Sequence, residues 1–192
     1  EFELLKTLRS VMREYQKEGF QWLKTLKEYG FGGILADDMG LGKTLQTIAF
    51  LLSEKEEAEQ RGEVLKPALV VCPSSLIYNW ENEFLRFAPQ MKVMPVAGTA
   101  RERKEMRQKA GAADVLITSY DLLRRDSKDY KDMEFSSMVI DEAQYIKNHK
   151  TQNAKAVKSI QALFRLALTG TPIENRLSEL WSIFDFLMPG FL

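Results

Sequence analysis

The sequence predicts an α/β fold built on a doubly wound, mostly parallel sheet with helices on both of its faces. Two observations lead to this prediction. Short β-rich runs alternate with helical patterns along the chain, and these runs are apolar nearly throughout rather than at every second position. Strands of that kind need cover on both faces, which the crossover helices of a parallel sheet provide. With 192 residues and 45% apolar composition, the chain is expected to form one domain over residues 1–192.

The predicted elements follow one another in a regular order. Apolar residues first show helical spacing over residues 12–30, where a glycine ends the pattern. The predicted strands are residues 33–36, 68–72, 92–97, 114–119, 137–141 and 164–169. The remaining predicted helices are residues 43–60, 74–88, 99–110, 119–125, 151–163 and 176–188. Two polar stretches, 53–66 and 124–135, are interpreted as surface connections because the alternation resumes after each.

Composition excludes several classes of function. Lysine plus arginine equals aspartate plus glutamate at 27 each, so any nucleic-acid partner would have to be contacted locally. The single cysteine, Cys72, cannot form an internal disulfide, which suits a reducing compartment. The single histidine, His149, lies in a polar run, which disfavours histidine metal sites and Ser-His-Asp triads. No apolar run approaches the ~18 residues that span a membrane, so we expect no membrane partner.

A glycine-bracketed turn, GLGKT at residues 40–44, follows the first predicted strand and opens the next helix. Such glycines let backbone N–H groups point at phosphate oxygens, and the helix N-terminus adds positive potential. Lys43 would supply charge for the β and γ phosphates, and Thr44 a hydroxyl for Mg²⁺. Asp37 stands where the fuller pattern has its first glycine, and a merely structural turn is the alternative. The predicted nucleotide-binding residues of this segment are Asp38, Met39, Gly40, Leu41, Gly42, Lys43, Thr44 and Leu45.

Paired acids, Asp141 and Glu142, close the predicted strand 137–141. Ligands of such sheets bind outside the carboxyl ends of the strands, so both acids are expected beside the glycine-bracketed turn. We expect Asp141 to hold Mg²⁺ from the side opposite Thr44. Glu142 is expected to point elsewhere and to orient or deprotonate the water that attacks the γ phosphate. Adjacent acids after a strand are otherwise typical of a helix N-cap.

Five segments together resemble the sucrose-nonfermenting (SWI/SNF-like) family of ATP-driven DNA translocases, within helicase superfamily two. They are DDMGLGKTLQT, VVCPSSLIYNWENEF, ITSYDLL, VIDEAQYIKN and LTGTPIENRLSELWSIFDFLMPG, and the resemblance covers nearly the whole chain. It implies a RecA-like P-loop NTPase lobe, the first of two motor lobes. It also implies ATP and Mg²⁺ as cofactors, double-stranded DNA as a partner, and ATP hydrolysis by the full-length protein.

The resemblance assigns adenine recognition to Gln16, in the segment REYQKEGFQWL. A glutamine amide offers a donor and an acceptor side by side, which matches adenine N7 and its exocyclic amine but not the two acceptors of guanine. ATP should therefore be preferred over GTP. The alternative is a glutamine on the helix surface without this role.

Two segments resemble the motifs that grip a nucleic-acid backbone in this family. Ser74 and Ser75 would contact phosphates from the start of a helix, and plain helix capping is the alternative. Thr118, Ser119 and Tyr120 resemble the second backbone-contacting motif, and an ordinary strand end is the alternative.

The segment LTGTP resembles the motif that couples the hydrolysis site to the DNA track. Thr169, Gly170 and Thr171 are the predicted coupling residues, and the two threonine hydroxyls would reach toward the acids of DEAQ. Gln144 replaces the histidine that is commonest at the end of the DEAH form, and we group it with Lys43, Asp141 and Glu142 as predicted catalytic residues. The sequence PIEN at 172–175, together with DEAQ, indicates a bacterial or archaeal branch and hence a cytoplasmic, nucleoid-associated protein. The basic stretch 99–110 carries interleaved glutamates, which favours a solvated face over a DNA-binding stripe.

These motifs predict half of a motor. The chain ends shortly after TGTP, so we expect the second RecA-like lobe of the same polypeptide to lie outside it and the isolated chain to hydrolyse ATP barely. DNA-bound proteins are a further candidate partner. Two alternatives remain open. One is a superfamily-two helicase lobe that separates RNA or DNA strands. This alternative is disfavoured because the chain has TGTP where strand-separating helicases have Ser-Ala-Thr. The other is a nucleotide-dependent interaction module such as a GTP switch, which would need an Asn-Lys-x-Asp tetrad that the chain lacks.

Overall fold

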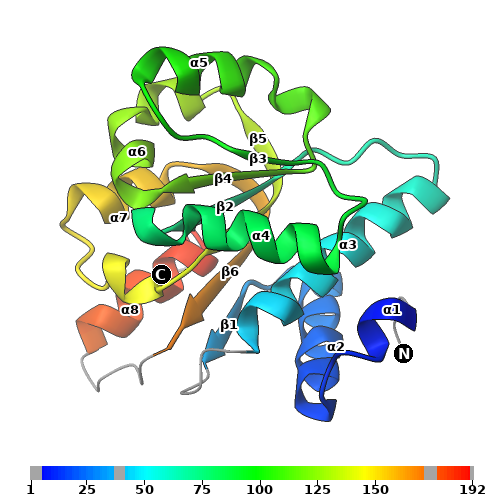
Figure 1. Cartoon of the computed structure of the whole chain (residues 1–192). Coiled ribbons are helices and arrows are strands. Elements are labelled where there is room, and N and C mark those ends of the chain that lie inside the picture. Colours follow the sequence, from blue (N-terminus) through cyan, green and yellow to red (C-terminus); the bar gives the residue numbers. More distant parts are fainter. Residues whose placement is uncertain (1–5, 37–41, 171–176, 191–192) are drawn as a thin grey trace.

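The computed structural model describes residues 6–36, 42–170 and 177–190, which form a six-stranded sheet with every pairing parallel (Figure 1). Its strands are β1 (Gly33–Ala36), β2 (Ala68–Cys72), β3 (Val93–Pro95), β4 (Val115–Ser119), β5 (Glu134–Ile140) and β6 (Gln161–Thr169). Their order across the sheet is β1-β6-β5-β2-β4-β3. The predicted α/β class and parallel sheet are therefore confirmed.

Eight α-helices and four 3₁₀ turns occur in the described part of the chain. The helices are α1 (Lys6–Arg9), α2 (Glu14–Glu28), α3 (Lys43–Gln60), α4 (Ile77–Phe87), α5 (Ala100–Gln108), α6 (Tyr120–Arg125), α7 (Gln152–Lys158) and α8 (Leu177–Leu187). The 3₁₀ turns are η1 (Ser74–Leu76), η2 (Ala110–Ala112), η3 (Ser127–Tyr130) and η4 (Ala143–Ile146). The helix predicted over 12–30 is α2, and Gly30 follows it with a φ of 77°, a left-handed conformation that glycine adopts at low cost.

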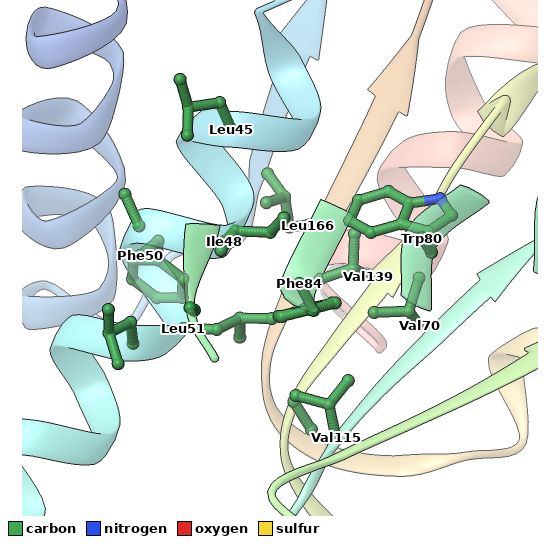
Figure 2. Close-up of a cluster of buried hydrophobic side chains, with 14 of the residues drawn as sticks. Leu45, Ile48, Phe50, Leu51, Val70, Trp80, Phe84, Val115, Val139 and Leu166 are labelled. Atoms are coloured by element: carbon green, nitrogen blue, oxygen red, sulfur yellow. The ribbon is translucent and has the colours of Figure 1, made fainter. Parts of the chain in front are cut away.

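Two apolar clusters, one on each face of the sheet, form the core. Successive strand residues point to opposite faces, so β2 contributes Val70 to one cluster and Leu69 and Val71 to the other. The first cluster is covered by α2, α3 and α4, and Figure 2 shows Val70 there with Ile48 of α3 and Trp80 of α4. The second cluster is covered by helices that include α6, α7 and α8. Helices on both faces bury strands that are apolar throughout, as the sequence predicts.

Two predicted boundaries, those before β6 and β5, are wrong. Residues 161–163 were expected to end a helix, but α7 ends at Lys158 and these residues open β6, where Gln161 and Ala162 pair with β5. The helix predicted over 43–60 is confirmed, since α3 has the same bounds, and of the stretch 53–66 that was interpreted as a surface connection, residues 53–60 belong to this helix. The strand expected from residue 137 already begins at Glu134. Short apolar runs fit a helix or a strand equally well in sequence, so sheet pairing decided these boundaries.

The carboxyl ends of the strands carry most of the predicted site residues. Gly42 follows β1, Ser74 follows β2 and Asp141 follows β5, while Ser119 and Thr169 are the last residues of β4 and β6. All strands run in one direction, so these segments lie along the same edge of the sheet (Figure 1). That edge is where ligands bind in open parallel sheets.

Candidate active site

The described part of the glycine-bracketed turn begins at Gly42, directly before α3. A Cβ at this position would lie 2.9 Å from the Tyr15 hydroxyl oxygen and 3.1 Å from Gln16 Nε2, so a larger residue would displace the ends of these two side chains of α2. Leu45 is buried and lines the adjoining pocket. The residues Asp38, Met39, Gly40 and Leu41, also predicted to bind nucleotide, lie outside the described residues.

Lys43, the first residue of α3, points into the molecule. Its side chain is almost fully buried, and Nζ donates a hydrogen bond of 2.8 Å to the backbone oxygen of Thr169 at the end of β6. A Cβ placed on Gly170 would lie 3.4 Å from this ammonium group and 4.0 Å from Glu142 Oε1. The structure thus brings Lys43, Thr169, Gly170 and Glu142 together. The hydrogen bond from Lys43 is accepted by the backbone carbonyl of Thr169, and Thr171 lies outside the described residues.

Asp141 directly follows β5, and both of its carboxylate oxygens accept hydrogen bonds. Oδ2 accepts from Trp80 Nε1 at 2.9 Å, and Oδ1 accepts from the backbone N–H of Glu142 at 2.9 Å. Burial raises the pKa of Asp141, and the charge of Glu142 adds to this effect, whereas the bond from Trp80 and the charge of Lys43 oppose it. Burial dominates, so the free carboxyl group holds its proton more tightly than an exposed aspartate does.

Glu142 adopts a left-handed backbone conformation, with φ 51° and ψ 57°, and is the one non-glycine residue with positive φ in the described residues. This conformation costs an L-residue about 1–2 kcal/mol. It breaks the alternation of side-chain directions that follows from a strand, and Asp141 and Glu142 line the same pocket. Within this pocket, Asp141 accepts a hydrogen bond from Trp80 and Glu142 accepts one from Gln144, so the expected difference in direction between the two acids is not contradicted. Strain of this kind is typical of functional sites.

Gln144 holds the side chain of Glu142. Its Nε2 donates a hydrogen bond of 2.5 Å to Glu142 Oε2. Its Oε1 is buried and has no hydrogen-bond partner within the described ranges. An unsatisfied buried acceptor costs about 1–3 kcal/mol, so this oxygen remains available to a donor that joins the site.

The predicted cation, hydroxyl group and carboxylates line one pocket. It has a volume of about 700 Å³ and lies between the start of α3, the polar side of α4 and the end of β5. Lys43, Thr44, Asp141 and Glu142 line it. The structure therefore places the predicted phosphate, metal and water residues in one cavity, while their roles stay predictions.

A second opening of about 500 Å³ adjoins the first through Lys43 and is bounded by α2. Arg13 and Tyr15 line it. Gln16 is buried beside it, with its Oε1 accepting a hydrogen bond of 2.8 Å from the backbone N–H of Arg13 and its Nε2 facing Gly42. The alternative that Gln16 lies on the helix surface is thus wrong. Adenine recognition by Gln16 stays a prediction.

The two predicted backbone-contacting segments differ in exposure. Ser74 and Ser75 are exposed in η1, directly after β2, where they are accessible to a partner. Thr118, Ser119 and Tyr120 are buried.

The hydroxyl groups of the buried segment are used within the protein. The Thr118 hydroxyl donates to Val96 O, and the Ser119 hydroxyl caps α6. The Tyr120 hydroxyl donates to Asp141 O at 2.6 Å. In this conformation these three side chains are not available to a nucleic acid, because they sit at a strand end that packs into the core.

Sequence reasoning missed Trp80, Arg13 and Tyr15 as residues of the site. Trp80 falls on the apolar stripe of α4 with Ile77 and Phe84, so its position indicates only a core residue. One general signal was available, since a buried indole N–H usually needs an acceptor. The identity of that acceptor, 61 positions along the chain, was not available from the pattern.

The fold and the pocket define a RecA-like P-loop lobe. The family model described as SNF2-related domain matches residues 15–192, and the chain belongs to this family. The structure is similar to that of the Sulfolobus solfataricus SWI2/SNF2 ATPase core in complex with double-stranded DNA, with a TM-score of 0.81, 46% identity and coverage of 93% of this chain and 36% of that one.

Two relatives show how widely this sequence is shared. TATA-binding protein-associated factor MOT1 of Saccharomyces cerevisiae is 47% identical over 198 residues, which span 100% of this chain and 11% of that protein. An ATP-dependent helicase of Mycoplasma pneumoniae is 48% identical over 181 residues, which span 94% of this chain and 17% of that protein. The chain thus spans about a tenth to a sixth of the length of these curated relatives. Relatives occur in both yeast and bacteria, so similarity alone does not single out the bacterial or archaeal branch. Within the described ranges, no helix is both long and apolar enough to cross a membrane.

Proposed function

We propose that the chain is the nucleotide-binding lobe of an ATP-driven translocase that moves along double-stranded DNA. The observation that carries this proposal is the pocket in which Lys43, Thr44, Asp141 and Glu142 meet. A cation, a hydroxyl and two carboxylates at the carboxyl edge of a parallel sheet match what phosphoryl transfer from a nucleotide requires. DNA enters the proposal through the similar ATPase core, which was solved with double-stranded DNA.

The residues of the pocket fit Mg²⁺ and a triphosphate. Magnesium keeps several waters and is bound through one or two protein groups plus substrate phosphates rather than by an all-protein cage. Thr44 and Asp141 supply two hard oxygen donors. No cluster of three or more His, Cys, Asp or Glu able to hold a metal occurs in the part of the chain that the structure describes. Gly42 leaves free a position where a Cβ would lie 3.1 Å from Gln16 Nε2.

The side chains of the pocket have distinct roles in the proposed reaction. When present, Mg²⁺ neutralises charge on the phosphate oxygens. Lys43 exchanges the Thr169 carbonyl for the β and γ phosphates, and Thr44 and Asp141 hold the metal. Glu142, positioned by Gln144, orients the attacking water or accepts its proton. Burial raises the pKa of Asp141, and a bound Mg²⁺ would oppose this by favouring the ionised carboxylate.

Adenine is proposed to bind on the α2 side, in the opening lined by Arg13 and Tyr15. The Tyr15 ring is 44% exposed there and offers a stacking surface. Gln16 recognises the base with its side-chain amide. To do so, its Oε1 gives up the hydrogen bond that it accepts from the backbone N–H of Arg13 in the nucleotide-free chain. This arrangement favours adenine over guanine.

The remaining parts of the proposed motor lie in the full-length protein. Ser74 and Ser75, exposed at the start of η1 and α4, contact the phosphate backbone of double-stranded DNA. The second RecA-like lobe of the same polypeptide supplies the arginines that hydrolysis needs, so the isolated chain is nearly inactive. DNA-bound proteins are the objects that such a motor remodels, and the cytoplasm of a bacterium or archaeon is the proposed location.

Binding measurements on the 192-residue chain test the nucleotide site. Calorimetry should detect Mg²⁺–ATP and show weaker binding of Mg²⁺–GTP. Lys43→Ala should weaken ATP binding by about 10- to 100-fold, the equivalent of one or two charge-assisted hydrogen bonds, with an unchanged circular dichroism spectrum. Lys150→Ala, on an exposed loop, is the matched control and should bind like the unaltered chain. Equal binding by both variants would refute the assigned site.

The DNA part of the proposal has one competitor, a helicase lobe that separates strands, and the Mycoplasma relative is named as a helicase. The two differ in the nucleic acid that stimulates hydrolysis. In the protein that carries both lobes, duplex DNA should stimulate ATP hydrolysis and single strands should not. Stimulation by single strands together with strand separation would instead support the helicase.

A further inference from the structure

The indole of Trp80 connects the apolar core to the metal-binding carboxylate. Its ring is 2% exposed and belongs to the cluster beneath α4, where Figure 2 shows it beside Phe84, Val139 and Val70. Its Nε1 donates a hydrogen bond of 2.9 Å to Asp141 Oδ2. The same ring lines the pocket that holds Lys43. Trp80 is therefore fixed by packing on one side and faces the proposed active site on the other.

Asp141 is held from several directions before any ligand arrives. Its backbone N–H donates to Val71 O at 2.7 Å, and its backbone oxygen accepts from the hydroxyl of Tyr120 at 2.6 Å. In the Asp141 side chain, Oδ1 accepts a hydrogen bond from the backbone N–H of Glu142, and Oδ2 accepts one from the indole N–H of Trp80. The carboxylate is thus held by one donor on each oxygen, and Trp80 supplies the donor that comes from a side chain.

The hydrogen bond from Trp80 leaves the carboxylate able to bind a metal. Each carboxylate oxygen has two lone pairs, and the indole N–H is a donor only, so one hydrogen bond on Oδ2 leaves acceptor capacity on both oxygens. The indole also carries no charge and cannot compete with Mg²⁺ as a cation. Partners of this kind, which orient a ligand without touching the metal, typically change metal affinity by 10- to 100-fold when they are removed.

We propose that Trp80 is a positioning residue for magnesium, and that its N–H orients Asp141 so that Mg²⁺ strengthens nucleotide binding. The inference rests on the proposed Mg²⁺–ATP function. It goes further, because it assigns the tryptophan of α4 to the metal site rather than to the core alone. The competing role is purely structural, in which the ring fills space and its N–H has no effect on the metal.

Trp80→Phe separates these roles, since phenylalanine retains an aromatic ring in the core and removes the donor. The affinity of the 192-residue chain for a fluorescent ATP analogue would be measured in EDTA and across a Mg²⁺ titration. For Trp80→Phe, the Mg²⁺ concentration at half-effect should rise about 10-fold, while affinity in EDTA stays unchanged. Trp181→Phe on α8 is the matched control and should behave like the unaltered chain.

A second measurement does not require Trp80→Phe to fold. The chain has three tryptophans, so Trp22→Phe and Trp181→Phe assign the indole N–H resonance of Trp80 by elimination. Adding Mg²⁺ to the ADP-bound chain should shift the Trp80 resonance and leave the other two unchanged. An unshifted Trp80 resonance, or a Mg²⁺ midpoint in Trp80→Phe within twofold of the unaltered chain, would overturn the inference while leaving the proposed function intact. If the unaltered chain binds no nucleotide at all, the proposed function fails first and the inference falls with it.

Discussion

Asp126 offers a severe test of how buried charges stabilise this fold. Its carboxylate accepts hydrogen bonds from Arg103 Nε at 2.6 Å, from Arg103 Nη2 at 3.0 Å and from Arg107 Nη1 at 2.7 Å. All three side chains are less than a tenth exposed, and they join α5 to the end of α6. Asp126→Asn would keep the size of the side chain but leave two buried guanidinium groups without their shared countercharge.

The expected loss of stability follows from these contacts. Removing one partner of a buried ion pair costs about 3–5 kcal/mol. The lower end applies here, because Arg103 still donates to Gly98 O, Arg107 still donates to Asp129 and the asparagine keeps one acceptor oxygen. A loss of about 3 kcal/mol would lower the midpoint of urea unfolding by about 1.5 M, taking a slope of about 2 kcal/mol/M. Far-UV circular dichroism measures this midpoint.

The pH dependence of the effect has a defined sign. Burial alone would raise the pKa of Asp126, but the hydrogen bonds and charges of Arg103 and Arg107 outweigh it and hold the pKa below its usual 3.8. A carboxylate with a lowered pKa stabilises the folded state above its unfolded pKa, and this contribution is lost as the pH falls through the folded pKa. The difference between the unaltered chain and Asp126→Asn should therefore be complete at pH 7 and shrink only below about pH 4.

A matched substitution supplies the control for this experiment. Asp121→Asn makes the same chemical change at an exposed pair with Arg124 and should cost less than about 0.5 kcal/mol. A loss below about 1 kcal/mol in Asp126→Asn, or equal losses in both variants, would refute the view that the buried cluster stabilises the fold.

Three further predictions concern the active site and its supports. Glu142→Gln should lower ATP hydrolysis by the two-lobed protein about 100-fold or more while Mg²⁺–ATP binding persists, as stopped-flow and steady-state assays would show; unchanged turnover would exclude Glu142 as the base. Tyr120→Phe removes the hydroxyl that binds Asp141 O and should lower the free energy of unfolding by about 1–2 kcal/mol; a loss within error would mean that another donor replaces it. Cys72 is fully buried, and burial raises the pKa of its thiol to about 12, so a disulfide reagent at pH 8 should label it only in urea.

The sheet and the position of Lys43 at a helix start were predictable because their signals are local. The strands β1 and β2 match the predicted residues 33–36 and 68–72, since short apolar runs bounded by polar residues mark buried parallel strands. Lys43 at a helix start and Asp141 at a strand end were placed by the same logic. Parallel strands put their carboxyl ends at one edge, so topology alone predicted that these two residues meet.

The predictions that failed depended on which distant segments pack together. Tyr120 was expected to face DNA, but it packs in the core and its ring stacks on Tyr145 at 5.0 Å. The left-handed backbone of Glu142 was not predicted. Neither the partner of an aromatic ring nor a strained dihedral angle appears in the spacing of residues along one segment.

The sequence by itself determined the class of fold, the edge of the sheet that carries the site, and the cation and acids that meet there, because periodicity and turn chemistry act over a few residues. Only the tertiary structure decided that Trp80 binds Asp141, that Gln144 holds Glu142 and that the Thr169 carbonyl binds Lys43. Two of these contacts, those of Trp80 and Lys43, join residues 61 and 126 positions apart. The geometry of a hydrogen bond between such residues is set by the packing of whole elements, which no local pattern of residues encodes.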